Sequence, residues 1–366
     1  METRAYNDII AECRRFARKE IAPVSLEMDL VPDPAGLDAI WRKSHALDLP
    51  VLLIPERCGG VGYPVLCAAL ILDTLASACA GIASVFATHW AASAASGKTA
   101  NKELLDYFSG DSVQPASLIL PDVLNGSNLK LSQAESGTTL SGESSIAGNA
   151  KFAHLFILLD DAAAGAEPLY AALPRDLPGL DVTDPLDLPG LKANSFAKIR
   201  FSDMEIKAER MLNKAAQGIE PAAAARDAYY GFIAAMAMGV ARKALEMAVS
   251  YAKARYQYGQ KIIHHQEIQR LLGDMQMKLG MGTAGYINLF DAKAINLSYF
   301  PADARLVKAF CTDAAMEIVM DAIQIHGGYG YMHEYGLEKM MRDVKMLQLL
   351  GGQNPYQQIR VMAEAL

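Results

Sequence analysis

Residues 254–269 read ARYQYGQKIIHHQEIQ, and residues 324–346 read QIHGGYGYMHEYGLEKMMRDVKM. The first stretch offers the forked cation of Arg255, which can bind two oxygens of one anion, and a glycine that permits a turn. In the second stretch the amide of Gln324 precedes Gly327 and Gly328, which let a backbone approach a ligand closely. Taken alone, each stretch is better explained by a surface arginine or by a helix that ends at a glycine pair. Their combination decides the interpretation of the whole chain.

Outward from these stretches, the hydrophobic pattern divides the 366 residues into three segments and predicts an α+β multidomain fold. We expect a helical domain over residues 1–114, a small β-barrel or sandwich over 115–205, and a helical domain over 206–366. At these boundaries the spacing of apolar residues changes from the helical period to the two-residue period of strands, and then back to the helical period. Strands are predicted at residues 129–133, 138–142, 156–160, 169–174 and 197–203.

Helices are predicted from apolar spacing and from their stop signals. In the first segment we expect one helix that ends at Pro23, a second that is ended by Pro50, and a third over residues 67–95. The third carries small and apolar residues on nearly every face, which predicts burial on all sides. In the last segment the helices are expected at residues 221–259, 264–296 and 302–328.

Composition and charge exclude several classes of protein. The net charge is −7 and the basic residues are scattered, so we expect no nucleic-acid partner. The longest apolar runs are far too short to span a bilayer. The first 23 residues mix acids with bases and lack an apolar leader, so we expect a cytoplasmic protein. The five cysteines form no CxxC pair, which predicts buried, reduced thiols without a disulfide framework or metal site.

The motifs, taken in this order along the chain, resemble the acyl-CoA dehydrogenase family. The resemblance extends over essentially the whole sequence, from RRFARKEIAP and PERCGGVG to the two stretches quoted above. It implies a helical domain, a middle β-domain and a C-terminal four-helix bundle. It also implies FAD, an acyl-CoA thioester substrate and assembly as a dimer of dimers. In the family each flavin lies between two subunits, one holding the ring and the other the pyrophosphate and adenosine end.

The resemblance assigns the pyrophosphate half of the site to residues that this chain retains. Arg255 takes the place of the family's arginine, and Gly327 and Gly328 let the backbone approach the cofactor. The full set of cofactor-binding candidates is Arg255, Gln257, Tyr258, Gln266, Gln324, Gly327, Gly328 and Ser127.

The flavin-ring half departs from the family pattern. The T-E-P-x-x-G-S-D stretch corresponds to residues 121–128, where Gly126 and Ser127 survive. The W-I-T stretch corresponds to residues 146–148, which read Ile-Ala-Gly. Alanine and glycine have no side-chain donor for the flavin ring, and isoleucine is a poor platform for a flat ring.

The catalytic base is the third departure. The glutamate of the family's Y-E-G-T motif falls on Gly351, and the threonine falls on Gln353. Members that carry the base elsewhere have it, with a CoA-contacting arginine, near Tyr229 and Tyr230, and neither phenol is a strong base at neutral pH. Asp227 is a weak candidate, because it could serve only if the helix began differently.

Three hypotheses explain this pattern. The first is a self-sufficient homotetrameric dehydrogenase with a displaced base. The second is a subunit of a heterotetramer that lends half of a flavin site to a catalytic partner chain. The third is a redox-neutral lyase, hydratase or isomerase of acyl-CoA. The second is favoured, because the lost motifs serve the chain's own site and the retained ones serve a neighbour's. An electron-transfer flavoprotein is the acceptor that the resemblance implies.

Two further groups of side chains are interpreted structurally. His89 is expected to be buried and hydrogen-bonded, and His326 to bind backbone, whereas His264 and His265 face different directions and make no metal site. Methionines at helical spacing in the last third are expected to lie in the core. They are Met275, Met277, Met281, Met316 and Met320.

Overall fold

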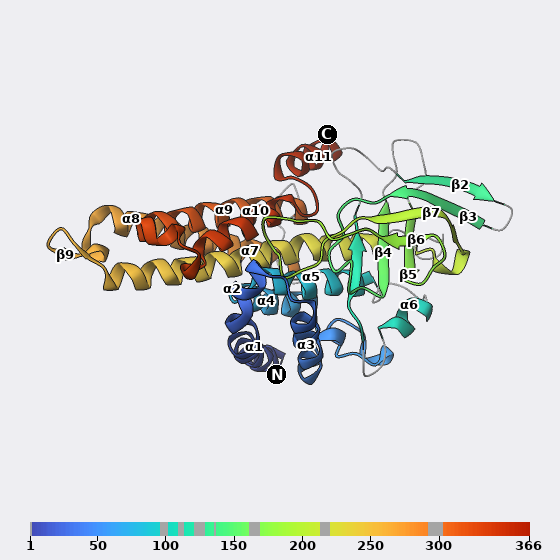
Figure 1. Ribbon diagram of the computed structural model, residues 1–366, viewed down its shortest axis with the longest axis horizontal. Coiled ribbons are helices and arrows are strands. Elements are labelled where there is room, and N and C mark those ends of the chain that lie inside the picture. Colours follow the sequence, from blue (N-terminus) through green and yellow to red (C-terminus); the bar gives the residue numbers. More distant parts are fainter. Residues whose placement is uncertain are drawn as a thin grey trace.

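The chain folds in the predicted order of a helical, a β and a second helical part (Figure 1). The computed structural model describes residues 2–95, 102–108, 113–120, 129–134, 137–160, 169–212, 220–291 and 303–366. The β part and a helical hairpin tip lie at opposite ends of the long axis. Within these ranges no helix combines the length and the apolar character needed to cross a membrane.

The described residues of the first part form six α-helices, and the start of this part differs from the prediction. Helical structure does not end at Pro23, because a π-helical turn over Ala17–Ile21 and a 3₁₀ turn over Ala22–Val24 carry the chain into the next helix. Proline is tolerated there because it opens a turn, where its missing N–H has no helical partner. The helices are α1 (Glu2–Phe16), α2 (Ser25–Leu30), α3 (Pro34–Ser44), α4 (Val65–Ala76), α5 (Ala80–Ala94) and α6 (Lys102–Tyr107).

The single helix predicted over residues 67–95 is in fact two, α4 and α5. Cys79 is extended between them, and the Ser77 hydroxyl donates to the Thr74 carbonyl at the end of α4. The prediction of burial on all sides is confirmed, because almost every residue of both helices is buried. His89 is buried as expected: its Nε2 lies 2.7 Å from the Pro50 carbonyl, and its Nδ1 accepts from the Ala116 N–H.

The β part is built of two sheets with a common core. One has the strand order β1 (Ala116–Ile119), β4 (Leu155–Asp160), β5 (Leu169–Pro174). The other has the order β2 (Lys130–Ala134), β3 (Gly137–Glu143), β7 (Ile199–Ile206), β6 (Leu180–Val182). Phe156 of the first sheet and Leu140 and Phe201 of the second belong to one buried cluster. All five predicted strands are confirmed, and the short strands β1 and β6 were missed.

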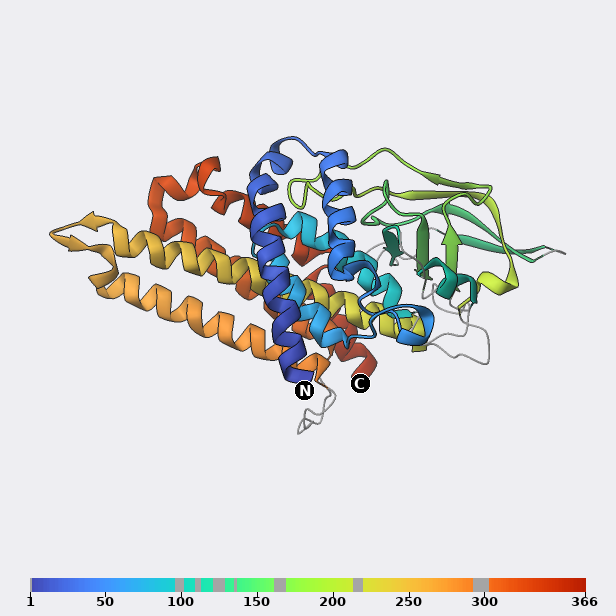
Figure 2. The same cartoon turned by 90° about the horizontal axis from the view of Figure 1, so that it is seen from below.

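The last part is a bundle around the 35-residue helix α7 (Glu220–Ala254). Helix α7 packs on α5 and, near its middle, on α4, where Arg242 binds Asp73, and it runs beside α8 to a small hairpin (Figure 2). The remaining elements are β8 (Tyr256–Gln257), β9 (Gln260–Lys261), α8 (Gln266–Phe290), α9 (Ala304–His326), α10 (Leu337–Leu349) and α11 (Asn354–Ala365). Three helices lie where they were predicted, but α7 ends five residues before the expected end, just ahead of strand β8. Helix α8 ends at Phe290, and residues 292–296 of its predicted range lie outside the described residues.

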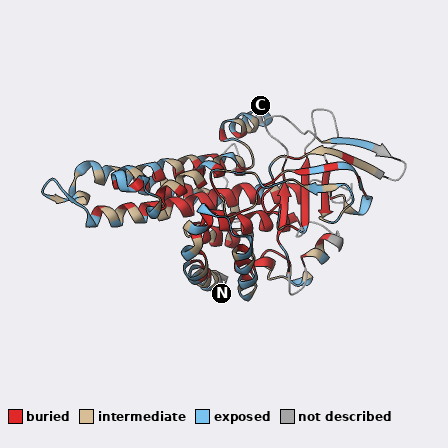
Figure 3. Ribbon diagram, viewed as in Figure 1, coloured by how far each residue is buried: buried red, intermediate tan, exposed pale blue. Residues whose placement is uncertain are grey.

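The methionine prediction was wrong for three of five side chains. Met275 is fully buried and Met316 is partly buried, whereas Met277, Met281 and Met320 are 60%, 63% and 47% exposed. Met277 and Met281 lie one turn apart and share a helix face. Met275 lies two residues before Met277, which places its side chain about 200° around the helix axis. The burial colouring shows the same contrast between a buried centre and an exposed bundle tip (Figure 3).

Candidate functional site

A cavity of about 600 Å³ lies at the tip of the bundle, where the hairpin meets the end of α9. Both quoted sequence stretches contribute to it, so the chain brings together residues that are 70 positions apart. Its lining residues are Tyr251, Arg255, Gln257, Tyr258, Ile262, His265, Ile268, Gln324, Ile325, His326, Gly327, Gly328, Tyr329 and Met332.

The hairpin places one side of the cavity. Helix α7 ends at Ala254, and strands β8 and β9 are joined through Tyr258 and Gly259, whose φ angles are 53° and 81°. Two consecutive positive φ angles are those of the hairpin turn that matches strand twist. This turn presents Arg255, Gln257 and Tyr258 on the side that faces α9.

The end of α9 places the other side. Gly327 terminates the helix with φ 59° and ψ −137°, a conformation open to glycine alone. A side chain added at Gly327 or Gly328 would meet no atom within 4 Å, so both glycines face open space beside the cavity. The absence of two side chains therefore leaves room for a ligand against the backbone.

His326 supports the cavity through an aromatic stack. Its Nδ1 lies 2.8 Å from the Ala322 carbonyl, and its ring stacks on Tyr251 at 4.3 Å. Burial lowers the pKa of His326, so the neutral ring with Nδ1–H toward the carbonyl is favoured. The prediction of a backbone-bonded histidine is confirmed. The Arg255 guanidinium carbon lies 6.0 Å from the centre of the Tyr329 ring and shares this aromatic surface.

Six of the eight predicted cofactor residues line this cavity: Arg255, Gln257, Tyr258, Gln324, Gly327 and Gly328. Gln266 begins α8 beside it and is exposed, and Ser127 lies outside the described residues. His265, expected from the sequence to be a surface or cofactor-proximal polar residue, also lines the cavity, but it was not among the cofactor-binding candidates. Its ring bonds the Gln260 side chain and the Gln257 carbonyl and so braces the hairpin. The position of His265 between strand β9 and the start of α8 was the sequence feature that could have indicated this role.

The positions assigned by resemblance to the flavin ring and the base gather elsewhere, at the β-domain end of α7. A side chain added at Gly148 would lie 3.1 Å from the Thr88 hydroxyl, and Thr88 hydrogen-bonds Tyr229. The next residue, Tyr230, meets Gly351, because an added Cβ there would lie 2.6 Å from the Tyr230 ring. These segments therefore lie close together, and their described positions carry none of the side chains expected from the family. The stretch assigned to residues 121–128 lies outside the described residues.

Asp227 lies away from this contact. It is solvent-exposed near the start of α7, and its charged neighbours are Arg226, Asp303 and Arg305. Tyr230, one turn further along the helix, is the residue that the structure places against Gly351. The weak assignment of Asp227 as a base remains a prediction without support from this geometry.

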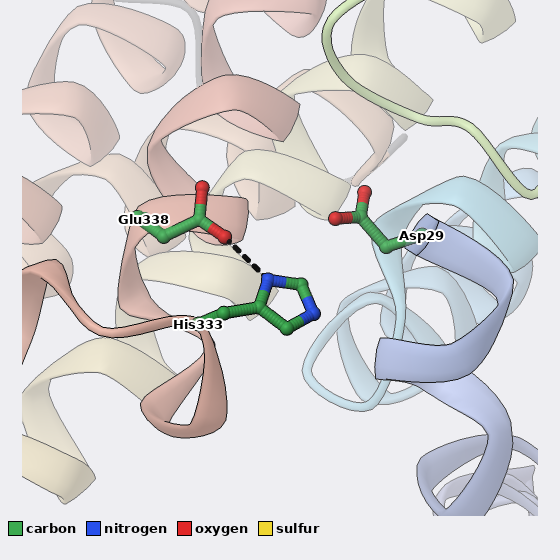
Figure 4. Close-up of side chains that lie close together, drawn as sticks. All are labelled: Asp29, His333 and Glu338. Carbon is green, nitrogen blue, oxygen red and sulfur yellow. Dashed lines mark hydrogen bonds and ion pairs between the residues drawn. The ribbon is translucent and has the colours of Figure 1, made fainter. Parts of the chain in front are cut away.

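One cluster among the described residues has the composition of a metal site. Asp29, His333 and Glu338 approach one another between α2 and α10 (Figure 4). The Arg342 guanidinium already binds both carboxylates, with Nη2 at 2.6 Å from Asp29 and Nε at 2.7 Å from Glu338. A metal ion would have to displace this cation, so we assign the cluster to ion pairing that joins α2 to α10.

Comparison with known proteins places this architecture in a family. The family profile described as acyl-CoA dehydrogenase, N-terminal domain matches residues 3–105, and that of the C-terminal domain matches residues 231–366. The probable acyl-CoA dehydrogenase YngJ of Bacillus subtilis (strain 168) is 30% identical over 367 residues, which cover 96% of this chain and 95% of that protein. The short-chain specific acyl-CoA dehydrogenase of Megasphaera elsdenii is 28% identical over 368 residues, covering 96% and 95%.

Solved structures agree at the level of the fold. Butyryl-CoA dehydrogenase from Megasphaera elsdenii superposes with a TM-score of 0.86 at 24% identity, covering 98% of this chain and 97% of that one. The prolyl acyl carrier protein oxidase AnaB superposes at 0.87 with 22% identity, covering 99% and 98%. The expected fold class is thereby confirmed, and the chain belongs to the acyl-CoA dehydrogenase family.

Proposed function

We propose that this chain is a subunit of a FAD-dependent acyl-CoA dehydrogenase and lends the pyrophosphate half of a flavin site to a catalytic partner chain. Membership of the family supports an oxidoreductase that acts on an acyl-CoA thioester. An acyl-CoA dehydrogenase of Bacillus anthracis with the same fold, at a TM-score of 0.86 and 22% identity, has been solved in complex with FAD. The chain retains the residues assigned to the pyrophosphate end and lacks those assigned to the flavin ring and the base. This difference supports a site shared between two chains.

The observation that carries the proposal is the separation of the two half-sites along α7. Tyr230 meets Gly351 near one end of this helix, and Arg255 follows its other end. The 25 residues between them rise by about 38 Å at 1.5 Å per residue, more than the diameter of a small domain. One cofactor therefore cannot use both ends of the same chain. A cofactor held at Arg255 needs a ring site from another chain.

The tip cavity has the chemistry for the pyrophosphate end of FAD. Arg255 offers two parallel N–H donors to phosphate oxygens, and the side-chain amides of Gln257 and Gln324 offer further donors. Gly327 and Gly328 leave space for the phosphates against the backbone. When bound, FAD supplies an acceptor for the hydride that leaves the acyl chain. The residues of this chain hold and orient it.

The ring half does not fit in the same way. Ala147 is buried and bridged to Ala197, and Gly148 has no side chain, so neither offers a hydroxyl to a flavin ring. Gly351 provides no carboxylate, and the Tyr230 ring lies where a larger side chain would extend. We therefore infer that the ring platform and the proton-abstracting group come from a partner subunit of the same family, in a heterotetramer. An electron-transfer flavoprotein is the proposed electron acceptor.

The test begins with native protein, its flavin content and mass spectrometry of every chain present. The proposal predicts one FAD per two chains and a second family member that carries a carboxylate. One FAD per chain in a homotetramer would contradict it and favour a displaced base, with Asp227→Asn as the next variant. Absence of both flavin and partner would favour a redox-neutral acyl-CoA enzyme.

Substitution of Arg255 tests directly whether this residue binds the cofactor. Arg255→Ala in the complex should weaken FAD binding by roughly 2–4 kcal/mol, as expected when one partner of a charge-assisted pair is removed. Arg270→Ala is the matched control, because Arg270 is exposed on neighbouring α8, lies outside the cavity lining and pairs with Glu267 on the same helix. Equal FAD retention in both variants would remove Arg255 from the site.

A further inference from the structure

Lys308 is a fully buried cation in α9 that no part of the proposed flavin chemistry uses. Its ammonium donates three hydrogen bonds: to the Gln348 carbonyl at 2.7 Å, the Gly352 carbonyl at 2.8 Å and the Asn354 side-chain oxygen at 2.8 Å. A lysine is almost never buried without such partners, because desolvation of the charge is costly. The side chain is thus fully engaged with the segment that joins α10 to α11.

All three partners of Lys308 act as acceptors. Two are backbone carbonyls, and the third is fixed because the Asn354 amide nitrogen donates to Thr312 at 2.8 Å and to Asp313 at 2.7 Å. Three acceptors require three N–H groups, which the ammonium has and the neutral amine lacks. Loss of the proton would therefore leave one of these buried acceptors without its partner.

The charged surroundings of Lys308 are sparse. Burial lowers its pKa to about 7, and the Asp313 carboxylate on the same helix opposes that shift. The facing parts of α10 and α11 present amides and carbonyls, which do not titrate. Arg305, one turn earlier, is engaged with Asp303 and Glu364. The Lys308 ammonium can therefore lose its proton within the neutral to mildly alkaline range.

The segment that Lys308 holds is a turn built on two glycines. Gly351 and Gly352 have φ angles of 69° and 104°, which disfavour any other residue. On the opposite side the Gln357 amide donates to the Gly351 carbonyl and to the Tyr230 hydroxyl. The turn is thus held from α9 by Lys308 and from α11 by Gln357.

We propose that the Lys308 ammonium is the positioning residue of the turn over residues 348–354. It fixes the turn against α9, sets the contact of Gly351 with Tyr230, and releases the turn when it loses its proton. The inference does not depend on flavin or on a partner chain. It concerns the β-domain end of the bundle, remote from Arg255 along α7.

The test is hydrogen exchange of native protein, followed by mass spectrometry, at several pH values between about 6 and 8.5, where a lysine of lowered pKa changes charge. After correction for the intrinsic rate, peptides over residues 348–357 should exchange faster as pH rises. In Lys308→Met these peptides should exchange roughly tenfold faster at pH ~6, as for loss of a charged hydrogen bond, and without further pH dependence. Lys345→Met is the matched control, because Lys345 is exposed and bonds the Gln348 side chain.

Several outcomes would overturn the proposal. One is wild-type exchange in this segment that does not change with pH. Another is acceleration in Lys308→Met that spreads equally over all helices, which would indicate general destabilisation. Equal exchange rates of these peptides in Lys308→Met and Lys345→Met would also overturn the proposal. If Lys308→Met does not fold, the wild-type series decides, together with Asn354→Ala, which removes one acceptor and should loosen the same peptides.

Discussion

Replacement of Gly351 by alanine should destabilise the protein through two separate effects. The backbone there has φ 69°, and a residue with a Cβ loses about 1–2 kcal/mol in this left-handed conformation. The new Cβ would also lie 2.6 Å from the Cε1 and 3.1 Å from the Cδ1 of Tyr230, whose ring is buried. Overpacking of this kind costs about 1–3 kcal/mol. The expected loss in the free energy of unfolding is therefore about 2–5 kcal/mol.

A double-mutant cycle separates the two effects. In the Tyr230→Ala background the steric part disappears, so Gly351→Ala should cost only the backbone part, and the coupling should be about 1–3 kcal/mol. Gly59→Ala is the control, because Gly59 has φ 82° and nothing within 4 Å of an added Cβ. Urea denaturation of the four proteins measures the cycle. Equal costs at Gly351 and Gly59, or strict additivity in the cycle, would refute the reasoning. The same contact predicts that Gly351→Glu alone restores no base.

Two further perturbations test the core that positions these elements. The pKa of buried His89 is lowered to about 4 by burial, so the unfolded chain takes up a proton first. Its contribution to stability is complete above pH ~6.5 and is lost as pH falls toward ~4, and His89→Gln should flatten that part of a urea-denaturation pH series. Asp73→Ala should lower the free energy of unfolding by about 2–4 kcal/mol, as measured by thermal denaturation, because it leaves the charge of Arg242 without this partner. About a third of the Arg242 side chain is exposed, which limits the loss. Asp38→Ala, which breaks an exposed pair, should cost less than about 0.5 kcal/mol, and a similar cost for both would contradict the burial argument.

The cavity at the bundle tip was predictable because its lining residues come from local motifs. Arg255 and its turn occupy one short stretch, and Gln324 with the glycine pair another, so residue types and order were enough to associate them. The three-part fold was predictable for a similar reason, since the period of apolar residues differs between helices and strands. The sequence alone left open which helix ends meet in space, and therefore which lining residues, such as His265, complete the cavity.

Features that depend on neighbours were predicted poorly. The break between α4 and α5 lies at residues 77–79, within an apolar run that looks uniformly helical. Met277 and Met281 match the spacing of core residues, but no described part of this chain covers their helix face. The contact of Tyr230 with Gly351 joins residues 121 positions apart, and residue types alone gave no indication of it. In each case tertiary context overrides a local pattern.

The geometry also explains how a loss at one half-site can coexist with retention at the other. Gly148 and Gly351 touch Thr88 and Tyr230 at the β-domain end of α7, and neither contributes to the cavity at Arg255. Distant sites without shared partners contribute additively, so substitutions at the first end change the free energy of binding at the second very little. Under the proposed division of labour, the loss of the chain's own base and ring contacts leaves the cavity at Arg255 intact. The two ends of one long helix keep the two half-sites apart, as that proposal requires.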